Sequence, residues 1–208
     1  MFEDIWQIGT AIPLLLCSIA AISLILDRSI FLAKQKDLSR EQYEQTLIKV
    51  TDSRAHDVTQ ELIASKVFYK QALEMLSKES NSEKTIRDEK ISTLMIVLNS
   101  RLRQRLSALV TVAALAPMLG LLGTIIGLMR AFRSIGEHAG PVEPSLVANG
   151  LWQALSTTAG GLIIAVFCIF AHAIFVSKIK KMLTRSQVLL NSLSVSIHQQ
   201  GNRSEQSQ

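Results

Sequence analysis

Three long apolar runs without a formally charged side chain constrain this chain more than any other feature. They cover residues 8–26, 106–129 and 144–177, which are 19, 24 and 34 residues long. An α-helix of about 20 apolar residues crosses the roughly 30 Å hydrocarbon core of a bilayer, because each residue adds about 1.5 Å. The runs therefore predict an all-α membrane protein with three transmembrane helices.

The distribution of basic residues predicts how these helices are oriented. Ten Lys and Arg residues lie just after the first run, just before the second and just after the third, whereas residues 130–143 carry only Arg130 and Arg133. Basic residues mark the cytoplasmic side, so the N-terminus is expected outside and the C-terminus inside. The predicted order is a periplasmic N-terminus (1–7), a first span (8–26), a cytoplasmic helical region (27–105), a second span (106–129), a periplasmic connector (130–147), a third span (148–177), and a cytoplasmic C-terminal helix with a disordered tail (178–208).

The second and third helices are expected to be longer than the membrane is thick. The 34 residues of the third run would measure about 51 Å as a helix, with Pro144 in its first turn. An apolar stripe leads into the second run at helical spacing, and no Gly or Pro interrupts the join. It consists of Ile91, Met95, Leu98, Leu102 and Leu106. The cytoplasmic helices carry a similar stripe of Val58, Leu62, Tyr69, Leu73 and Leu76. The tail from Gln199 is polar and is expected to be disordered.

Composition argues against several other classes of protein. The net charge is +5, but 15 basic and 12 acidic residues are intermingled between positions 27 and 106, which favours a solvated mixed-sign surface over a nucleic-acid site. Cys17 and Cys168 lie inside apolar runs, with no metal-ligand spacing. No P-loop, GxSxG, HExxH or paired-carboxylate motif is present. We therefore expect no enzyme, no metal site and no cofactor.

Small residues form one face of each of the last two spans. Such faces allow two membrane helices to approach closely. On the second span the face contains Ala113, Pro117, Gly120, Thr124, Gly127 and Ala131, with Gly123 beside it; on the third it contains Ala154, Thr158, Gly161, Ala165, Cys168 and His172, flanked by Gln153, Thr157 and Gly160. We predict helix packing through these glycines and a bend at Pro117.

The polar residues among them have two interpretations that residue chemistry alone leaves open. Thr124, Thr157 and Thr158 could return their hydroxyls to backbone carbonyls and serve packing only. Together with Gln153, whose amide is costly to bury without partners, they could instead line a narrow hydrated ion path. His172 is the only titratable side chain in the runs apart from the cysteines. A neutral imidazole near the cytoplasmic end, bonded to a neighbouring helix, is the preferred interpretation over a proton relay.

Two segments together resemble a known family. APMLGLLGTIIGL at residues 116–128, followed by GLWQALSTTAGGL at 150–162, is similar to the paired signature of the MotA/TolQ/ExbB proton channel family. Three spans and a large cytoplasmic loop resemble its ExbB/TolQ branch, since the MotA branch has a fourth span. The specific similarity covers roughly residues 105–180, and the first span agrees in position only.

The resemblance implies a motor or stator subunit in the bacterial inner membrane. Several copies, a pentamer in the family, surround the single-span helices of an ExbD- or TolR-like partner, and proton flow drives work on a TonB- or TolA-like protein. The family's path threonines correspond to Thr124 and Thr158. Gln153 occupies a position where ExbB and TolQ proteins usually have glutamate, so it cannot relay a proton, and sodium becomes a second candidate ion. A stand-alone channel or carrier and a non-conducting membrane scaffold are the alternatives, and the choice between TonB and Tol systems stays open.

Overall fold

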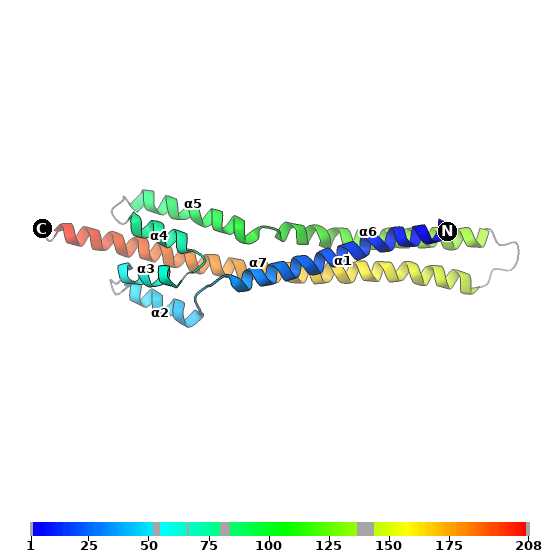
Figure 1. The fold of residues 1–208 in the computed structure, drawn as a ribbon, viewed down its shortest axis with the longest axis horizontal. Coiled ribbons are helices and arrows are strands. Elements are labelled where there is room, and N and C mark those ends of the chain that lie inside the picture. The colour runs from blue at the N-terminus through cyan, green and yellow to red at the C-terminus, as the bar shows by residue number, and fades with distance from the viewer. Residues whose placement is uncertain (1, 52–54, 66, 80–83, 137–143, 207–208) are drawn as a thin grey trace. The chain divides into compact units, whose positions relative to one another are not determined.

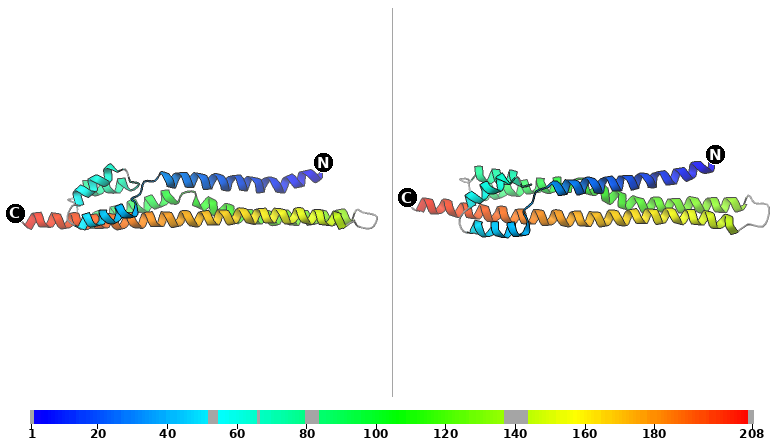
Figure 2. Two further views of the ribbon diagram at one scale, coloured as in Figure 1. Left: turned by 90° about the horizontal axis from the view of Figure 1, so that it is seen from below. Right: turned by 60° about the horizontal axis from the view of Figure 1, so that its bottom comes forward.

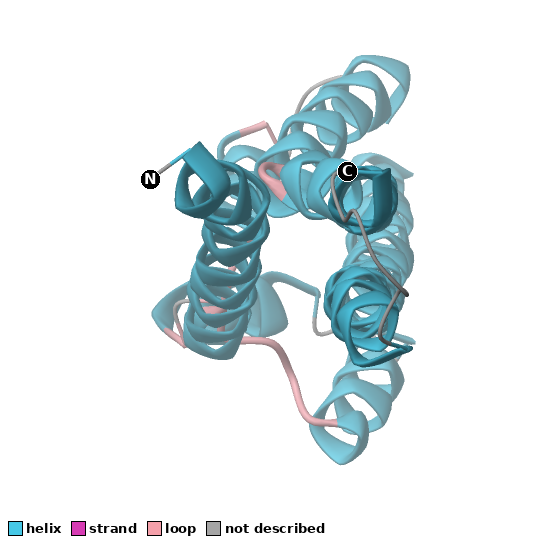
Figure 3. Ribbon diagram, turned by 90° about the vertical axis from the view of Figure 1, so that its right-hand side faces the viewer, coloured by secondary structure: helices cyan, strands magenta, loops and turns pink. Residues whose placement is uncertain are grey.

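The computed structural model describes residues 2–51, 55–65, 67–79, 84–136 and 144–206. Within these ranges every regular element is an α-helix (Figure 3). The helices shown in Figure 1 are α1 (Phe2–Lys34), α2 (Arg40–Thr51), α3 (Ala55–Ala64), α4 (Lys70–Lys78), α5 (Lys84–Arg103), α6 (Leu106–Gly136) and α7 (Pro144–Gln206). Three helical stretches are long and apolar enough to cross a membrane, at Ile12–Lys34, Lys84–Arg133 and Gly150–Gln200. An all-helical fold with three long apolar helices is confirmed.

The first of two compact units contains the apolar helices. It comprises residues 1–29 and 105–175, which are most of α1, all of α6 and the first half of α7. Hydrocarbon offers no hydrogen-bond partner to the backbone, so each segment satisfies its own N–H and C=O groups as a helix. In this unit α6 and α7 run side by side in every view (Figures 1 and 2). As predicted, α7 begins at Pro144.

The second unit comprises residues 30–104 and 176–208. Here α2 packs on α3, α3 on α4 and α4 on α5. The predicted stripe from Val58 to Leu76 is confirmed as core, since its five members are all at least 95% buried and belong to one apolar cluster with Leu189, Leu190 and Leu193 of α7. The start of α2 is fixed by a capping box: Gln42 N–H donates to Ser39 Oγ at 3.2 Å, and Ser39 N–H donates to Gln42 Oε1 at 3.1 Å.

A buried polar group ties α5 to α7 inside this second unit. Arg87 is fully buried and donates from Nε to Ser194 Oγ at 3.1 Å and from Nη2 to the Ser194 carbonyl at 2.9 Å. The Ser194 hydroxyl in turn donates to Asp88 Oδ1 at 2.6 Å. A buried guanidinium requires such partners, so this group fixes the register of the two helices.

The structure differs from the sequence-based expectation at two places. The stripe from Ile91 to Leu106 is buried as predicted, but the helix through it is interrupted: α5 ends at Arg103, and Arg105 has a φ of 67°. Absence of Gly and Pro was therefore an insufficient reason to expect a continuous helix. At the other end, α7 continues to Gln206, so residues 199–206, expected to be disordered, are helical. They extend a helix that is already nucleated, and adding residues to it is less costly than starting one.

Candidate functional site

Glycines bring the backbones of α6 and α7 into direct contact in the first unit. A Cβ at Gly120 would lie 3.0 Å from both the Thr157 carbonyl oxygen and the Thr158 Cα, and one at Gly123 would lie 2.5 Å from Thr157 Oγ1. A Cβ at Gly161 would overlap the Ala116 carbonyl oxygen. A larger residue at Gly161 would force the two helices apart, because the atoms it meets belong to the α6 backbone. The two predicted small-residue faces are thus packed against each other.

The contact also includes Gly127 and a glycine that sequence reasoning did not select. A Cβ at Gly127 would lie 2.8 Å from the Ala154 Cβ, and one at Gly150 would lie 2.9 Å from the Ala131 Cβ. Gly160 behaves differently, because its added Cβ would meet only Leu14 Cδ2 at an ordinary 3.5 Å. Gly160 therefore faces α1, while its neighbour Gly161 faces α6.

Threonine hydroxyls lie along this helix contact. Thr158 Oγ1 donates across the interface to the Gly120 carbonyl at 2.9 Å. Thr157 Oγ1 donates to the Ala154 carbonyl of its own helix at 2.7 Å and lies 3.5 Å from the Gly120 carbonyl. Thr124, one turn after Gly120 on α6, donates to the Leu121 carbonyl at 2.6 Å. All three side chains are only partly buried. The structure thus brings Thr157 and Thr158 to the level of Gly120.

The other predicted site residues are placed as follows. Gln153 belongs to α7, but its side chain lies outside the part of the chain that the structure describes. His172 is half-buried on α7, 14 residues after Thr158 and thus about 21 Å further along the helix. Pro117 lies inside α6 and is half-buried. The predicted path therefore centres on the threonines, and His172 is separate from them.

The remaining faces of α6 and α7 are apolar and exposed. Leu121, Ile125, Ile163, Val166 and Phe170 are all at least 49% exposed. Large apolar surfaces of this kind suit acyl chains or other membrane helices. The three threonines at the contact are thus partly buried, whereas these large apolar side chains are exposed.

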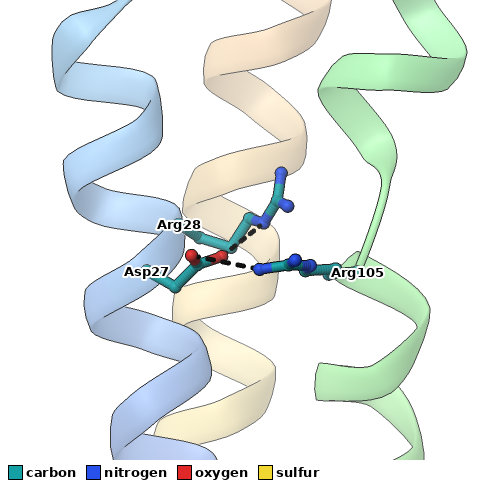
Figure 4. Close-up of polar contacts among 3 residues, drawn as sticks. All are labelled: Asp27, Arg28 and Arg105. Atoms are coloured by element: carbon teal, nitrogen blue, oxygen red, sulfur yellow. Dashed lines mark hydrogen bonds and ion pairs between the residues drawn. The ribbon is translucent and has the colours of Figure 1, made fainter.

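A charged cluster marks the end of this unit where α6 begins (Figure 4). Arg105 Nη1 donates to Asp27 Oδ1 at 3.2 Å, and Arg28 Nε lies 3.4 Å from Asp27 Oδ2. Arg28 is 4% exposed, so the carboxylate offsets part of the cost of burying its charge. Because Asp27 lies on α1, the ion pair links α1 to Arg105, the residue that directly precedes α6.

The backbone of Arg105 gives a test of the helix interruption. A non-glycine residue in the left-handed region carries an energetic penalty that glycine does not. We expect the free energy of unfolding of Arg105→Gly to be about 1 kcal/mol higher than that of Arg105→Ala. Both variants lose the ion pair with Asp27. Thermal unfolding of the two purified variants in the same detergent measures the difference. Equal stabilities would mean that the left-handed conformation at this position is wrong.

The pattern of the sequence contains a signal for some of the missed residues and none for others. Gly150 could have been found by extending the third-span stripe back one turn from Ala154. Asp27 and Arg105 flank the first and second apolar runs, but nothing in the spacing shows that two residues 78 positions apart meet. The direction of each hydroxyl bond depends on a side-chain rotamer, which sequence does not reveal.

Comparison with known proteins assigns the family. The profile of the MotA/TolQ/ExbB proton channel family matches residues 59–187, more than half of the chain. The chain is 28% identical over 165 residues to the biopolymer transport protein exbB1 of Vibrio cholerae, an alignment that covers 77% of this chain and 72% of that protein. It is 40% identical over 86 residues to the biopolymer transport protein ExbB of Aquifex aeolicus, covering 41% of this chain and 57% of the relative.

A third relative, the biopolymer transport protein ExbB of Neisseria gonorrhoeae, is 31% identical over 108 residues, which are 52% of this chain and 47% of that protein. The chain thus spans about half the length of the last two relatives. The matched region contains the glycine contact and the threonines of α6 and α7. With three long apolar helices and this match, the chain belongs to the MotA/TolQ/ExbB proton channel family.

Proposed function

We propose that this chain is the ion-conducting subunit of an energy-transducing complex in the bacterial inner membrane. Several copies, expected to be five, surround the single-span helices of an ExbD- or TolR-like partner. The ion is expected to be a proton, and the work is passed to a TonB- or TolA-like protein. The N-terminus lies in the periplasm, and the second unit, residues 30–104 with 176–208, lies in the cytoplasm.

The observation that carries this proposal is the hydroxyl-bearing contact between α6 and α7. Thr158 bonds to Gly120 across the contact, and Thr124 follows one turn later on α6. Hydroxyl groups can line a polar path without holding a charge themselves. This is the arrangement that would be needed beside a charge that is supplied by another chain.

The charge in the path must come from the partner in this proposal. Residues 106–129 and 148–177 contain no Asp, Glu, Lys or Arg, and Gln153 cannot take up a proton. A partner carboxylate would accept a proton from the periplasmic side, pass the threonines and release it on the cytoplasmic side. One charge crossing 100 mV is worth about 2.3 kcal/mol, so several protons together could repack a helix interface.

The test is proton uptake by vesicles that contain the chain alone, the partner alone, or both. The partner is the single-span protein that co-purifies with this chain and has an aspartate just inside its apolar run. We expect uptake only when both are present, and we expect Thr158→Val to reduce it by about tenfold or more, which corresponds to about 1.4 kcal/mol, the scale of one hydrogen bond.

Thr111→Val is the matched control for this experiment. Its hydroxyl also donates to its own helix, to the Ser107 carbonyl at 3.1 Å, but the side chain is exposed and lies away from the α6–α7 glycine contact. Uptake should therefore be unchanged. Conduction by this chain without a partner would favour a stand-alone channel. Proton uptake that is unchanged both by Thr158→Val and by loss of the partner's carboxyl would contradict the proposed mechanism.

A further inference from the structure

The backbone at Arg105 has a conformation that a residue with a side chain does not favour. Among the residues that the structure describes, Arg105 is the one non-glycine residue with a positive φ, at 67°. This left-handed conformation is disfavoured for residues with a Cβ, because the Cβ approaches the following carbonyl oxygen. Such a conformation persists only where other interactions hold it.

The sequence on both sides of Arg105 is suited to one continuous helix. Residues 84–116 contain neither Gly nor Pro. Four leucines before and after the interruption recur at helical spacing and are no more than 9% exposed: Leu98, Leu102, Leu106 and Leu109. A continuous helix through Arg105 would keep all four on one face. It would also give intrahelical acceptors to the first three N–H groups of α6, which have none at the start of a separate helix.

The interaction that opposes this continuous helix comes from Asp27 of α1. Its Oδ1 accepts from Arg105 Nη1 at 3.2 Å, and Arg28 Nε lies 3.4 Å from its Oδ2 (Figure 4). Closing the helix would take φ of Arg105 from 67° to about −63°. A rotation of this size redirects the side chain, so the ion pair with Asp27 would open.

The two opposing effects at Arg105 are of similar size. Its side chain is 59% exposed, and an exposed ion pair contributes only modestly to stability. The left-handed backbone is disfavoured by a comparable amount. Neither effect outweighs the other by a wide margin, so the broken and the continuous forms of this segment are close in free energy.

We propose that residues 103–106 form a two-state switch: Asp27 of α1 holds the helix broken at Arg105, and opening of their ion pair lets α5 and α6 join into one continuous helix. α6 carries the glycine contact with α7, and α5 packs in the core of the second unit through Ile91, Met95 and Leu98. A displacement of α1 would thus change the backbone that connects these two helices. The inference goes beyond the proposed function and can be tested without a partner or an ion gradient, so its failure leaves the proposed function standing.

The test is the distance between spin labels at two exposed threonines, Thr93 on α5 and Thr111 on α6. They are 18 positions apart, which is five helical turns, so a continuous helix places both labels on one face about 27 Å apart. A bend between them shortens this distance. Thr93→Cys and Thr111→Cys are introduced into the full chain with Cys17 and Cys168 replaced by alanine. Labelled chain is diluted with unlabelled chain, and pulsed electron paramagnetic resonance then measures distances within one copy.

The wild type is expected to show mainly the shorter distance. Arg105→Gln and Asp27→Asn remove the ion pair from opposite sides, and each should raise the ratio of helical to shorter distance roughly twofold to fivefold, the equivalent of one exposed ion pair. Arg105→Gly also loses the pair, but glycine favours the left-handed backbone and disfavours a helix. Its ratio should therefore lie about tenfold below that of Arg105→Gln. Arg105→Lys keeps the charge and should keep the wild-type ratio.

A matched control removes an exposed ion pair elsewhere. Glu74→Gln loses the pair with Lys70 on α4, at 3.2 Å, and should leave the ratio unchanged. A wild type that shows mainly the helical distance would overturn the switch, and so would equal ratios in the wild type, Arg105→Gln and Arg105→Gly. A rise in Asp27→Asn without one in Arg105→Gln would also overturn it, because the effect would then come from the buried Arg28. Where Asp27→Asn does not fold, Arg105→Gln and Arg105→Gly decide the result.

Discussion

Replacing Gly161 by valine is expected to separate α6 from α7 and to abolish proton uptake. Any Cβ at this position would overlap the Ala116 carbonyl oxygen and lie 3.3 Å from the Gly120 Cα. Both neighbours are backbone atoms, which cannot rotate away, so the helices must move apart. The hydrogen bond from Thr158 to Gly120 then breaks. Overpacking typically costs about 1–3 kcal/mol, and the upper end is expected against rigid backbone. Thermal unfolding in detergent measures the loss.

The adjacent Gly160 provides the matched control. Its added Cβ would meet Leu14 Cδ2, the end of a flexible side chain, at 3.5 Å. We expect Gly160→Ala to keep wild-type uptake and to change the free energy of unfolding by less than about 1 kcal/mol, in the stabilising direction if the helical preference of alanine dominates. Equal losses in Gly160→Ala and Gly161→Val, or wild-type behaviour of Gly161→Val, would show that α6 and α7 do not pack through this face.

Helical periodicity predicted much of this contact because membrane helices that approach closely need small residues at regular spacing. The stripe through Gly120, Gly127 and Ala131 and the stripe through Ala154 and Gly161 are the residues that meet in the structure. The same periodicity identified the core of the second unit from Val58 to Leu76. The spacing of residues shows which of them share one face of a helix. Where two membrane helices each have a face of small residues, those two faces are expected to pack against each other.

Spacing could not predict features that depend on side-chain rotamers or on a third segment. Thr157 and Thr158 are neighbours in sequence, yet one oxygen is covered by Gly123 and the other bonds to Gly120. The helix interruption before Leu106 involves Arg105, whose guanidinium pairs with Asp27 from α1. A residue that takes a left-handed conformation without being glycine leaves no local mark in the sequence.

The burial of Arg87 was equally inaccessible to sequence reasoning. In the pattern of α5 it is one of several basic residues in a polar segment, and basic residues are usually exposed. It donates two hydrogen bonds to Ser194, more than 100 positions away, and the Ser194 hydroxyl in turn donates to Asp88. The fold of the second unit therefore depends on a polar group that hydrophobic patterning does not reveal.

Substitution of Arg87 by alanine is expected to lower the free energy of unfolding of the second unit by about 3–5 kcal/mol. The change removes the two hydrogen bonds to Ser194 and leaves a cavity where a fully buried side chain stood. Arg101→Ala removes the same charge from an exposed position of α5 and should change stability by no more than about 0.5 kcal/mol. Chemical denaturation of the two purified variants, monitored by the circular dichroism of the helical backbone, compares their free energies of unfolding.

Arg87→Met separates the two contributions to that loss. Methionine fills most of the buried volume but makes none of the hydrogen bonds, and replacement of a buried charged group by an apolar one of similar size is often neutral or stabilising. If Arg87→Met is as stable as the wild type, the group fixes the register of α5 against α7 without adding net stability. If Arg87→Met instead loses as much free energy of unfolding as Arg87→Ala, the polar interactions of Arg87 provide the stability, because methionine restores the buried volume but not the hydrogen bonds to Ser194. Cysteine cross-linking between α5 and α7 in Arg87→Met distinguishes a register shift from a simple loss of stability, since a shifted register changes which pairs of positions cross-link.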